Sequence, residues 1–139
     1  MQNSLRILFF FILVFSFSCE ENGFIVKCSD CTLDEPVKAE LEAKLDQDFY
    51  YSGVLIQIWE GNLEDSILIG NYTSYDTSFS EWVTINKKYT MTATYYISND
   101  KYIAIDSATP RVKYDKSQCD DPCYYIYDRK CDLRLKYTK

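Results

Sequence analysis

From Pro36 onward, apolar and polar residues alternate along the chain, a period of two that is typical of β-strands. The clearest run is 37–45, in which Val, Ala, Leu, Ala and Leu alternate with Lys, Glu, Glu and Lys. Helix propensity favours these residue types, but a helix would spread the apolar ones around all of its sides, so the periodicity predicts a strand. Shorter strands are predicted at 54–58, 67–69, 83–85, 90–95, 102–105, 112–114, 124–127 and 131–137. The pattern predicts an all-β chain without a helix, folded as an antiparallel β-sandwich of about seven strands within 36–139.

Four aromatic residues lie outside the phase of the predicted core and are candidates for binding. Trp59 and Trp82 have the phase opposite to the apolar side chains of their strands. Adjacent strand residues point to opposite faces, so one ring of each tyrosine pair at 95–96 and 124–125 points outward, which makes Tyr96 and Tyr124 candidates as well. Exposed flat rings stack on sugars or anchor a protein partner. The alternative is cross-strand aromatic pairing that only covers a sheet face.

The N-terminal residues have the pattern of a secretory leader. Nine consecutive apolar residues, 7–15, follow Arg6 and precede the segment 16–18. This run is shorter than the roughly 20 residues that a membrane-spanning helix needs, and its flanks are those of a signal peptide. Cys19 follows directly, which predicts a lipoprotein signal over 1–18 and two or three acyl chains on Cys19, enough for a stable membrane anchor. The alternative is an ordinary signal peptide with a structural thiol at Cys19.

Five cysteines remain if Cys19 carries lipid, so one of them stays unpaired. Cys131 shares its phase with the leucines at 133 and 135, which predicts a buried free thiol. The other four are disulfide candidates in any of three pairings: Cys28, Cys31, Cys119 and Cys123. Two bonds between the N-terminal and the C-terminal pair would each close about 90 residues, worth about 4–5 kcal/mol apiece, whereas local bonds would be worth about 2 kcal/mol.

The same four cysteines allow two other kinds of chemistry. Four thiolates with spacings Cys-x2-Cys and Cys-x3-Cys could bind zinc, and 28–31 has the spacing of a redox pair. Redox pairs normally need a helix N-terminus to lower the thiol pKa, and 28–31 instead precedes a strand. An oxidising compartment favours disulfide bonds over thiolate ligands. We therefore expect structural disulfides, with no metal and no other cofactor.

Composition narrows the function classes further. The chain has 139 residues, with 15 Lys and Arg against 21 Asp and Glu, and a formal net charge of −6. This balance argues against a nucleic-acid partner, which would need clustered basic residues. The absence of histidine excludes Ser-His-Asp and Cys-His catalysis and His-ligated zinc. Residues 19–35 mix charges, glycine and two cysteines, which predicts an acidic tether in front of the domain.

Two segments resemble known families. Residues 82–93 resemble the strand–turn–strand of prealbumin-like sandwiches, including carboxypeptidase regulatory-like modules, in which a tyrosine opens the second strand as Tyr89 does here; Lys88 stands where those modules commonly have glycine. The segment 16–19 departs from the usual lipobox and resembles the relaxed form of Bacteroidota. There, acidic residues after the cysteine, here Glu20 and Glu21, direct export to the cell surface. With the cysteine cluster at 119–123, the chain resembles a small Bacteroidota surface lipoprotein with a prealbumin-like or immunoglobulin-like sandwich.

These patterns predict a lipid-anchored, non-catalytic β-sandwich on the outer membrane or cell surface that binds a glycan or a protein partner. Its contact with the membrane would be through the anchor. The alternative function is a structural accessory subunit or spacer of an envelope complex, without a small ligand. An enzyme comes third, because the sequence contains no recognisable nucleophile–base pair.

Overall fold

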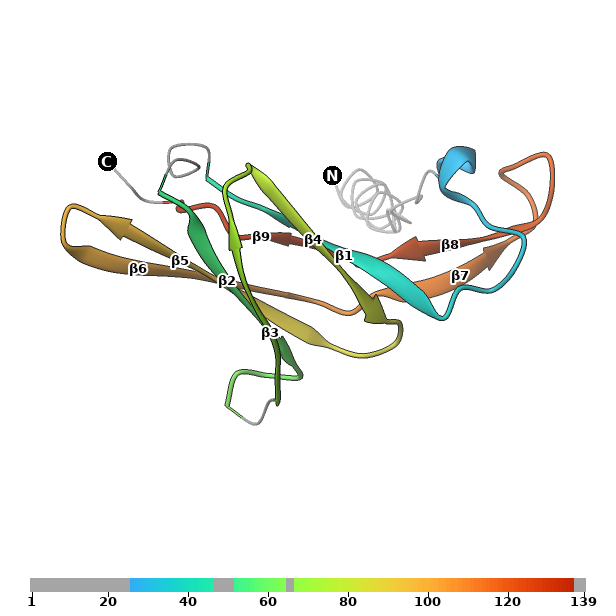
Figure 1. Cartoon of the computed structure of the whole chain (residues 1–139). Coiled ribbons are helices and arrows are strands. Elements are labelled where there is room, and N and C mark those ends of the chain that lie inside the picture. The colour runs from blue at the N-terminus through green and yellow to red at the C-terminus, as the bar shows by residue number, and fades with distance from the viewer. Residues whose placement is uncertain (1–25, 47–51, 65–66, 137–139) are drawn as a thin grey trace, which may run out of the picture.

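The computed structural model describes residues 26–46, 52–64 and 67–136, and most of these lie in strands (Figure 1). Within those ranges, no helix is long and apolar enough to cross a membrane. The predicted signal peptide, the lipidation candidate Cys19 and the first part of the predicted tether lie outside the described residues. In chain order the elements are the 3-10 helix η1 (Cys28–Asp30) and the strands β1 (Lys38–Lys44), β2 (Val54–Glu60), β3 (Ile67–Ser74), β4 (Ser78–Thr84), β5 (Tyr89–Ile97), β6 (Asp100–Ala108), β7 (Arg111–Asp115), β8 (Cys123–Tyr127) and β9 (Lys130–Asp132).

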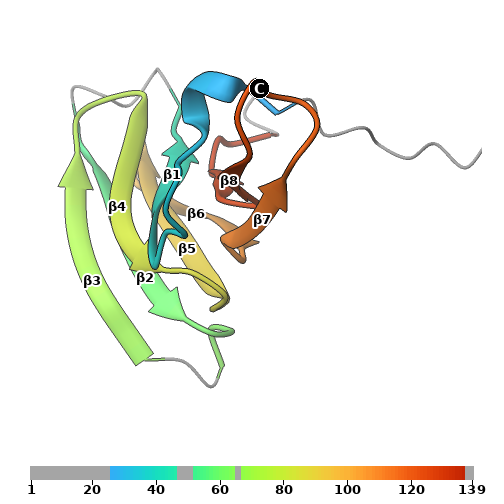
Figure 2. The same ribbon diagram turned by 90° about the vertical axis from the view of Figure 1, so that its right-hand side faces the viewer.

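The strands form two sheets that face each other and a separate two-stranded ribbon (Figure 2). One sheet has the order β4-β1-β9, the other has the order β3-β2-β5-β6, and β7 pairs with β8. All pairs are antiparallel except β1 with β9, which is parallel. The predicted all-β sandwich is therefore confirmed, with nine described strands and one parallel pair.

The core lies between the two sheets and consists of the side chains that each strand points inward. Alternating residues of β1 and β2 supply one part of it, and the opposite phase of these strands faces outward. Both β5 and the residues around β9 complete it. The buried core residues are Leu41, Ala43, Leu45, Val54, Ile56, Ile58, Val83, Tyr89, Met91, Ala93, Tyr95, Ala108, Cys131 and Leu133.

Alternation predicted most of this core correctly, but it was wrong at the start of β1. Val37 was expected on the buried face, and its side chain is 73% exposed. It precedes the first ladder pair of β1, Lys38 with Thr84, so no neighbouring strand covers it. Ile67 and Ile69 lie in a strand, as predicted, but both are exposed, because β3 is the edge strand of its sheet.

The threonines of β5 were expected on a half-exposed surface, and the structure buries them. Thr90, Thr92 and Thr94 point to the outer face of the four-stranded sheet, opposite to the core residues of the same strand. Because β5 is an inner strand, longer side chains of β2 and β6 flank the threonines on both sides. The threonines are therefore buried by neighbouring side chains on the outer face and are not part of the core.

The last predicted strand, 131–137, is much shorter in the structure. Ladder pairing of β9 with β1 ends at Asp132, opposite Lys44, where β1 itself ends. The next amide, that of Leu133, still donates to the Lys44 carbonyl at 3.0 Å, and the chain then leaves the sheet. The alternation of apolar and polar residues continues beyond the last residue that has a partner strand. The pattern therefore predicted a strand that is too long.

The segment 82–93 connects the two sheets. As the resemblance implied, Tyr89 opens a strand, β5. However, β4 pairs with β1, whereas β5 pairs with β2 and β6. The turn between Thr84 and Tyr89 therefore carries the chain across the sandwich from one layer to the other.

Candidate functional site

Two disulfide bonds join the residues before β1 to the loop between β7 and β8. Cys28 is bonded to Cys119 and Cys31 to Cys123, with Cα–Cα distances of 5.7 and 5.4 Å. The predicted disulfides are confirmed, and the pairing that the sequence left open is the long-range one. The Sγ atoms of Cys31 and Cys119 lie 3.8 Å apart, so the four sulfurs form one cluster. While both bonds are formed, this cluster offers no thiolate to a metal ion.

Local structure around the first two cysteines explains how both reach the same loop. The 3-10 turn of η1 places residues three apart on one side of the chain, whereas an extended segment would separate the two cysteines by about 10 Å. Immediately after η1, Thr32 exchanges two backbone hydrogen bonds with Tyr124 of β8, at 2.9 and 2.8 Å. The described end of the predicted tether is therefore attached to the β7–β8 ribbon both covalently and by backbone pairing.

Cys131 is a buried free cysteine, as predicted from its phase. Burial raises the pKa of its thiol to about 12, and the carboxylates of Asp106 and Asp128 act in the same direction. At neutral pH the group is a protonated, small apolar side chain of the core and not a nucleophile.

The four aromatic candidates lie on three different surfaces. Trp82 is 63% exposed on the outer face of the three-stranded sheet. Trp59 and Tyr96 share the outer face of the four-stranded sheet; Tyr96 is exposed, whereas Trp59 is half-buried and its indole Nε1 is buried with no hydrogen-bond partner among the described residues. Tyr124 is half-buried on the ribbon, where its ring packs against Tyr114 with 4.8 Å between the centroids. The structure therefore does not bring the four rings together.

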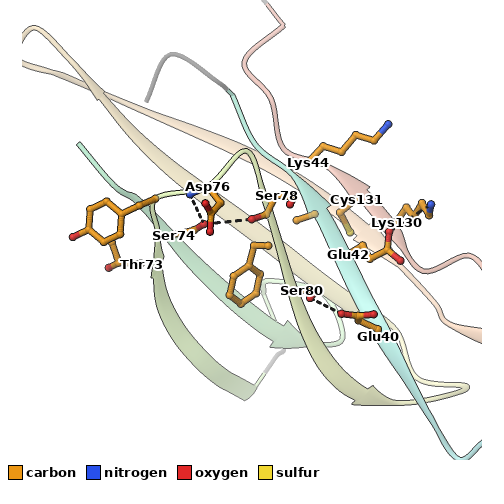
Figure 3. Close-up of a pocket in the computed structure, with 13 residues that line it drawn as sticks. Glu40, Glu42, Lys44, Thr73, Ser74, Asp76, Ser78, Ser80, Lys130 and Cys131 are labelled. Atoms are coloured by element: carbon orange, nitrogen blue, oxygen red, sulfur yellow. Dashed lines mark hydrogen bonds and ion pairs between the residues drawn. The ribbon is translucent and has the colours of Figure 1, made fainter. Parts of the chain in front are cut away.

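Beside Trp82, the three-stranded sheet and the β3–β4 turn form a polar cleft of about 720 Å³ (Figure 3). Trp82 does not line the cleft, but it is directly opposite Glu40 in the β1–β4 ladder and two residues from Ser80 on the same face, so it is the next residue of that face beyond the lining. Residues of β1, the β3–β4 turn, β4 and β9 line the cleft. Its polar lining comprises Glu40, Glu42, Lys44, Thr73, Ser74, Asp76, Ser78, Ser80 and Lys130.

Two carboxylates of the cleft have side-chain partners, charged ones in one case and a neutral one in the other. The Glu42 carboxylate forms ion pairs with Arg129 at 2.5 Å and with Lys130 at 3.4 Å. The Glu40 carboxylate accepts a hydrogen bond from the Ser80 hydroxyl at 2.6 Å. The cleft therefore presents a mixture of hydroxyl groups, carboxylates and ammonium groups without a dominant sign of charge.

A second exposed ring, Tyr75, lines the cleft itself and is 60% exposed. Gly53 leaves room for this ring: its φ of +75° favours glycine, and a Cβ at this position would lie 2.9 Å from the Tyr75 ring and from the Thr73 methyl group. The turn is closed by the Ser74 hydroxyl, which accepts a hydrogen bond from the Asp76 amide at 3.2 Å (Figure 3).

Sequence analysis missed Tyr75 and the acidic residues of the cleft. Tyr75 lies within a short polar segment, 73–78, and a single aromatic residue between turn-forming residues was a signal that could have identified it. No such signal connects Glu40 with Lys130, because only the parallel pairing of β1 with β9 brings these strands together.

Comparison with known proteins adds no relative. No protein-family model, no curated protein and no solved structure matches the chain. Candidate residues therefore rest on geometry alone.

Proposed function

We propose that this chain is a lipid-anchored, non-catalytic binding module of the bacterial outer membrane or cell surface, and that it binds a glycan in the cleft beside Trp82. The observation that carries the proposal is the position of the exposed Trp82 on the same sheet face as Glu40 and Ser80, which line a cleft together with further hydroxyl and carboxylate groups. Flat aromatic rings stack on the apolar faces of sugar rings, and hydroxyl and carboxylate groups bind sugar hydroxyls by hydrogen bonds.

The charge of the cleft favours a neutral glycan. Glu42 is already paired with Arg129 and Lys130, and Glu40 is hydrogen-bonded to Ser80. An anionic ligand would have to compete with Glu42 for these cations. A neutral ligand would displace only solvent from the same groups.

The proposal is tested by screening the full-length chain on a glycan array and measuring the best neutral glycan by titration calorimetry. Trp82→Ala and Tyr75→Ala are each expected to weaken binding about tenfold, which corresponds to about 1.4 kcal/mol. Tyr96→Ala is the matched control, because Tyr96 is as exposed as Trp82 but lies on the other sheet. All three side chains are exposed, so the free energy of unfolding should change by less than about 1 kcal/mol. Equal loss of binding in Tyr96→Ala, or undiminished binding in Trp82→Ala, would contradict the proposal.

Support for the lipid anchor comes from the apolar run 7–15 and from Cys19 directly after the small residues. Cells of a bacterium that processes lipoproteins should incorporate labelled palmitate into the chain, and Cys19→Ser should abolish the label. An unlabelled wild-type chain would remove the anchor from the proposal and leave the cleft untouched.

A structural accessory role is the second candidate, and the outer face of the four-stranded sheet favours it. This face exposes several apolar side chains: Leu55, Leu68, Tyr96, Ile103 and Ile105. Clustered exposed apolar residues are typical of protein-interaction surfaces. Crosslinking in cells that recovers one stoichiometric envelope protein, unaffected by Trp82→Ala, would favour this role over glycan binding.

A further inference from the structure

The longest edge strand of the molecule, β6, is unpaired along its outer side in the described residues. It is the last strand of the sheet β3-β2-β5-β6 and has nine residues without proline or glycine. Proteins usually protect such an edge with short strands, proline, bulges or a covering loop, because its free amide and carbonyl groups pair readily with another strand. Tyr102, Ile103 and Ile105 are also exposed here.

One hydrogen bond shows which amides of β6 point to the free edge. The Ser107 amide does not pair with β5 but donates to the Asp106 carboxylate at 2.8 Å. Backbone groups in an antiparallel strand alternate between the two sides, so the amides of 101, 103 and 105 point in the same direction as that of Ser107. These amides therefore have no partner strand in the described part of the chain.

A cleft of about 310 Å³ runs along this edge. On one side it is lined by β6 residues 102–105 and on the other by the chain end after β9, residues 132–136 except Leu133. Next to the last lining residue of β6, the Asp106 carboxylate accepts a hydrogen bond from the Asp132 amide at 2.7 Å, which links β6 to β9. Because β9 stops early, no strand fills the space between β9 and β6 in the described part of the chain.

We propose that this edge is a strand-addition site that takes an extended peptide segment of a partner protein, paired with β6 along 101–105. Four residue steps span about 13 Å, enough for one short added strand. Backbone hydrogen bonds to residues 101, 103 and 105 would provide affinity, and alternate side chains of the peptide would enter the cleft or extend the outer face of the sheet.

Charge specifies the peptide further. Two basic residues line the cleft, Arg134 and Lys136, against one acidic residue, Asp132, whereas the whole chain has a net charge of −6. Asp132 is bound by Arg134 through two hydrogen bonds of 2.8 and 2.7 Å and also interacts with the charge of Lys136, so the cleft lining has one more basic than acidic residue. The complementary segment alternates apolar and polar residues and carries acidic residues at one end.

The test uses the full-length chain and a fluorescent eight-residue peptide in which valine alternates with threonine and one end carries two aspartates. Saturable binding in fluorescence anisotropy, with slower amide exchange at residues 101, 103 and 105, is the expected result. Ile103→Pro should weaken binding at least tenfold, because it removes an edge amide that does not face β5. Ile103→Val is the matched control: it retains the amide and should bind as the wild type does. Lys136→Glu should weaken binding at least threefold.

A peptide-side control keeps the test decisive if Ile103→Pro fails to fold. The same peptide with an N-methyl group on every residue cannot donate a backbone hydrogen bond along either edge and should not bind the wild-type chain. No binding of the unmodified peptide up to 1 mM, or equal binding of the N-methylated peptide, would overturn the proposal. Loss of peptide binding would leave the glycan cleft on the other sheet unaffected, so the two proposals fail separately.

Discussion

Removal of one disulfide bond is expected to cost less than half the free energy of unfolding that removal of both costs. The bonds Cys28–Cys119 and Cys31–Cys123 cross each other along the chain, and their members are three residues apart on one side and four on the other. Once either bond has formed, the unfolded chain already contains the long loop. The second bond then restricts only a small ring.

Loop-closure entropy gives the magnitude. The first bond closes about 90 residues and contributes about 4.6 kcal/mol at 25 °C. The second closes a ring of about nine residues, made of 28–31 and 119–123, and contributes about 2.6 kcal/mol. Either single removal should therefore cost about 2.6 kcal/mol, and removal of both about 7 kcal/mol. The independent estimate of 4–5 kcal/mol for each bond counts the long loop twice.

Urea unfolding followed by tryptophan fluorescence measures these costs. The variants are Cys28→Ala with Cys119→Ala, Cys31→Ala with Cys123→Ala, and all four together, compared in a double-mutant cycle. A coupling free energy of about 2 kcal/mol between the bonds is expected. Additive costs, or a four-alanine variant that loses less than about 3 kcal/mol, would refute the loop-closure argument.

Two further predictions concern the core and the cleft. The Cys131 thiol has a pKa of about 12 in the folded chain and about 9 when unfolded. Its contribution to the free energy of unfolding is therefore fully present below pH 9 and is lost as the pH rises toward 12. The free energy of unfolding should fall by about 1.4 kcal/mol between pH 8 and pH 10, and in Cys131→Ala this contribution to the urea-unfolding profile should disappear. Gly53→Ala should displace the Tyr75 ring, cost about 1–3 kcal/mol of stability and weaken glycan binding as Tyr75→Ala does, although residue 53 does not line the cleft; unchanged calorimetry would contradict this.

Side-chain alternation was sufficient to predict the sandwich because its inner positions are determined by burial on one face. In 37–45 every apolar residue after Val37 lies in the core, in spite of a composition that favours a helix. The same rule failed at the ends, where Val37 and residues 133–136 continue the alternation without a partner strand. Alternation reports which side of a strand is apolar, but not whether a neighbouring strand is present.

The sequence pattern did not predict which strands that are distant in the chain pair with each other. The parallel pairing of β1 with β9 joins Glu42 to Lys130, and this contact, together with the β3–β4 turn, forms the cleft beside Trp82. The phase of Trp82 correctly predicted an exposed ring, but phase alone could not distinguish it from Trp59, whose indole nitrogen is buried. The difference arises from neighbouring side chains on the four-stranded sheet, which a single strand does not reveal.

Backbone pairing stabilises some parts of the molecule, and covalent bonds stabilise others. The β7–β8 ribbon pairs with neither sheet, and a two-stranded ribbon is only marginally stable alone. Its described attachments to the chain before β1 include the Thr32–Tyr124 pair, the hydrogen bond from the Val26 amide to the Gln118 side chain at 3.0 Å and the two disulfide bonds. The bonds therefore stabilise the part of the fold that sheet pairing leaves weakest. At the β6 edge, pairing with β5 along the whole strand secures one side, and the free backbone groups on the other side remain available to a partner. An unpaired edge is compatible with a stable fold only because β6 contributes few of the buried core residues, so pairing along that edge changes what the protein binds and not whether it folds.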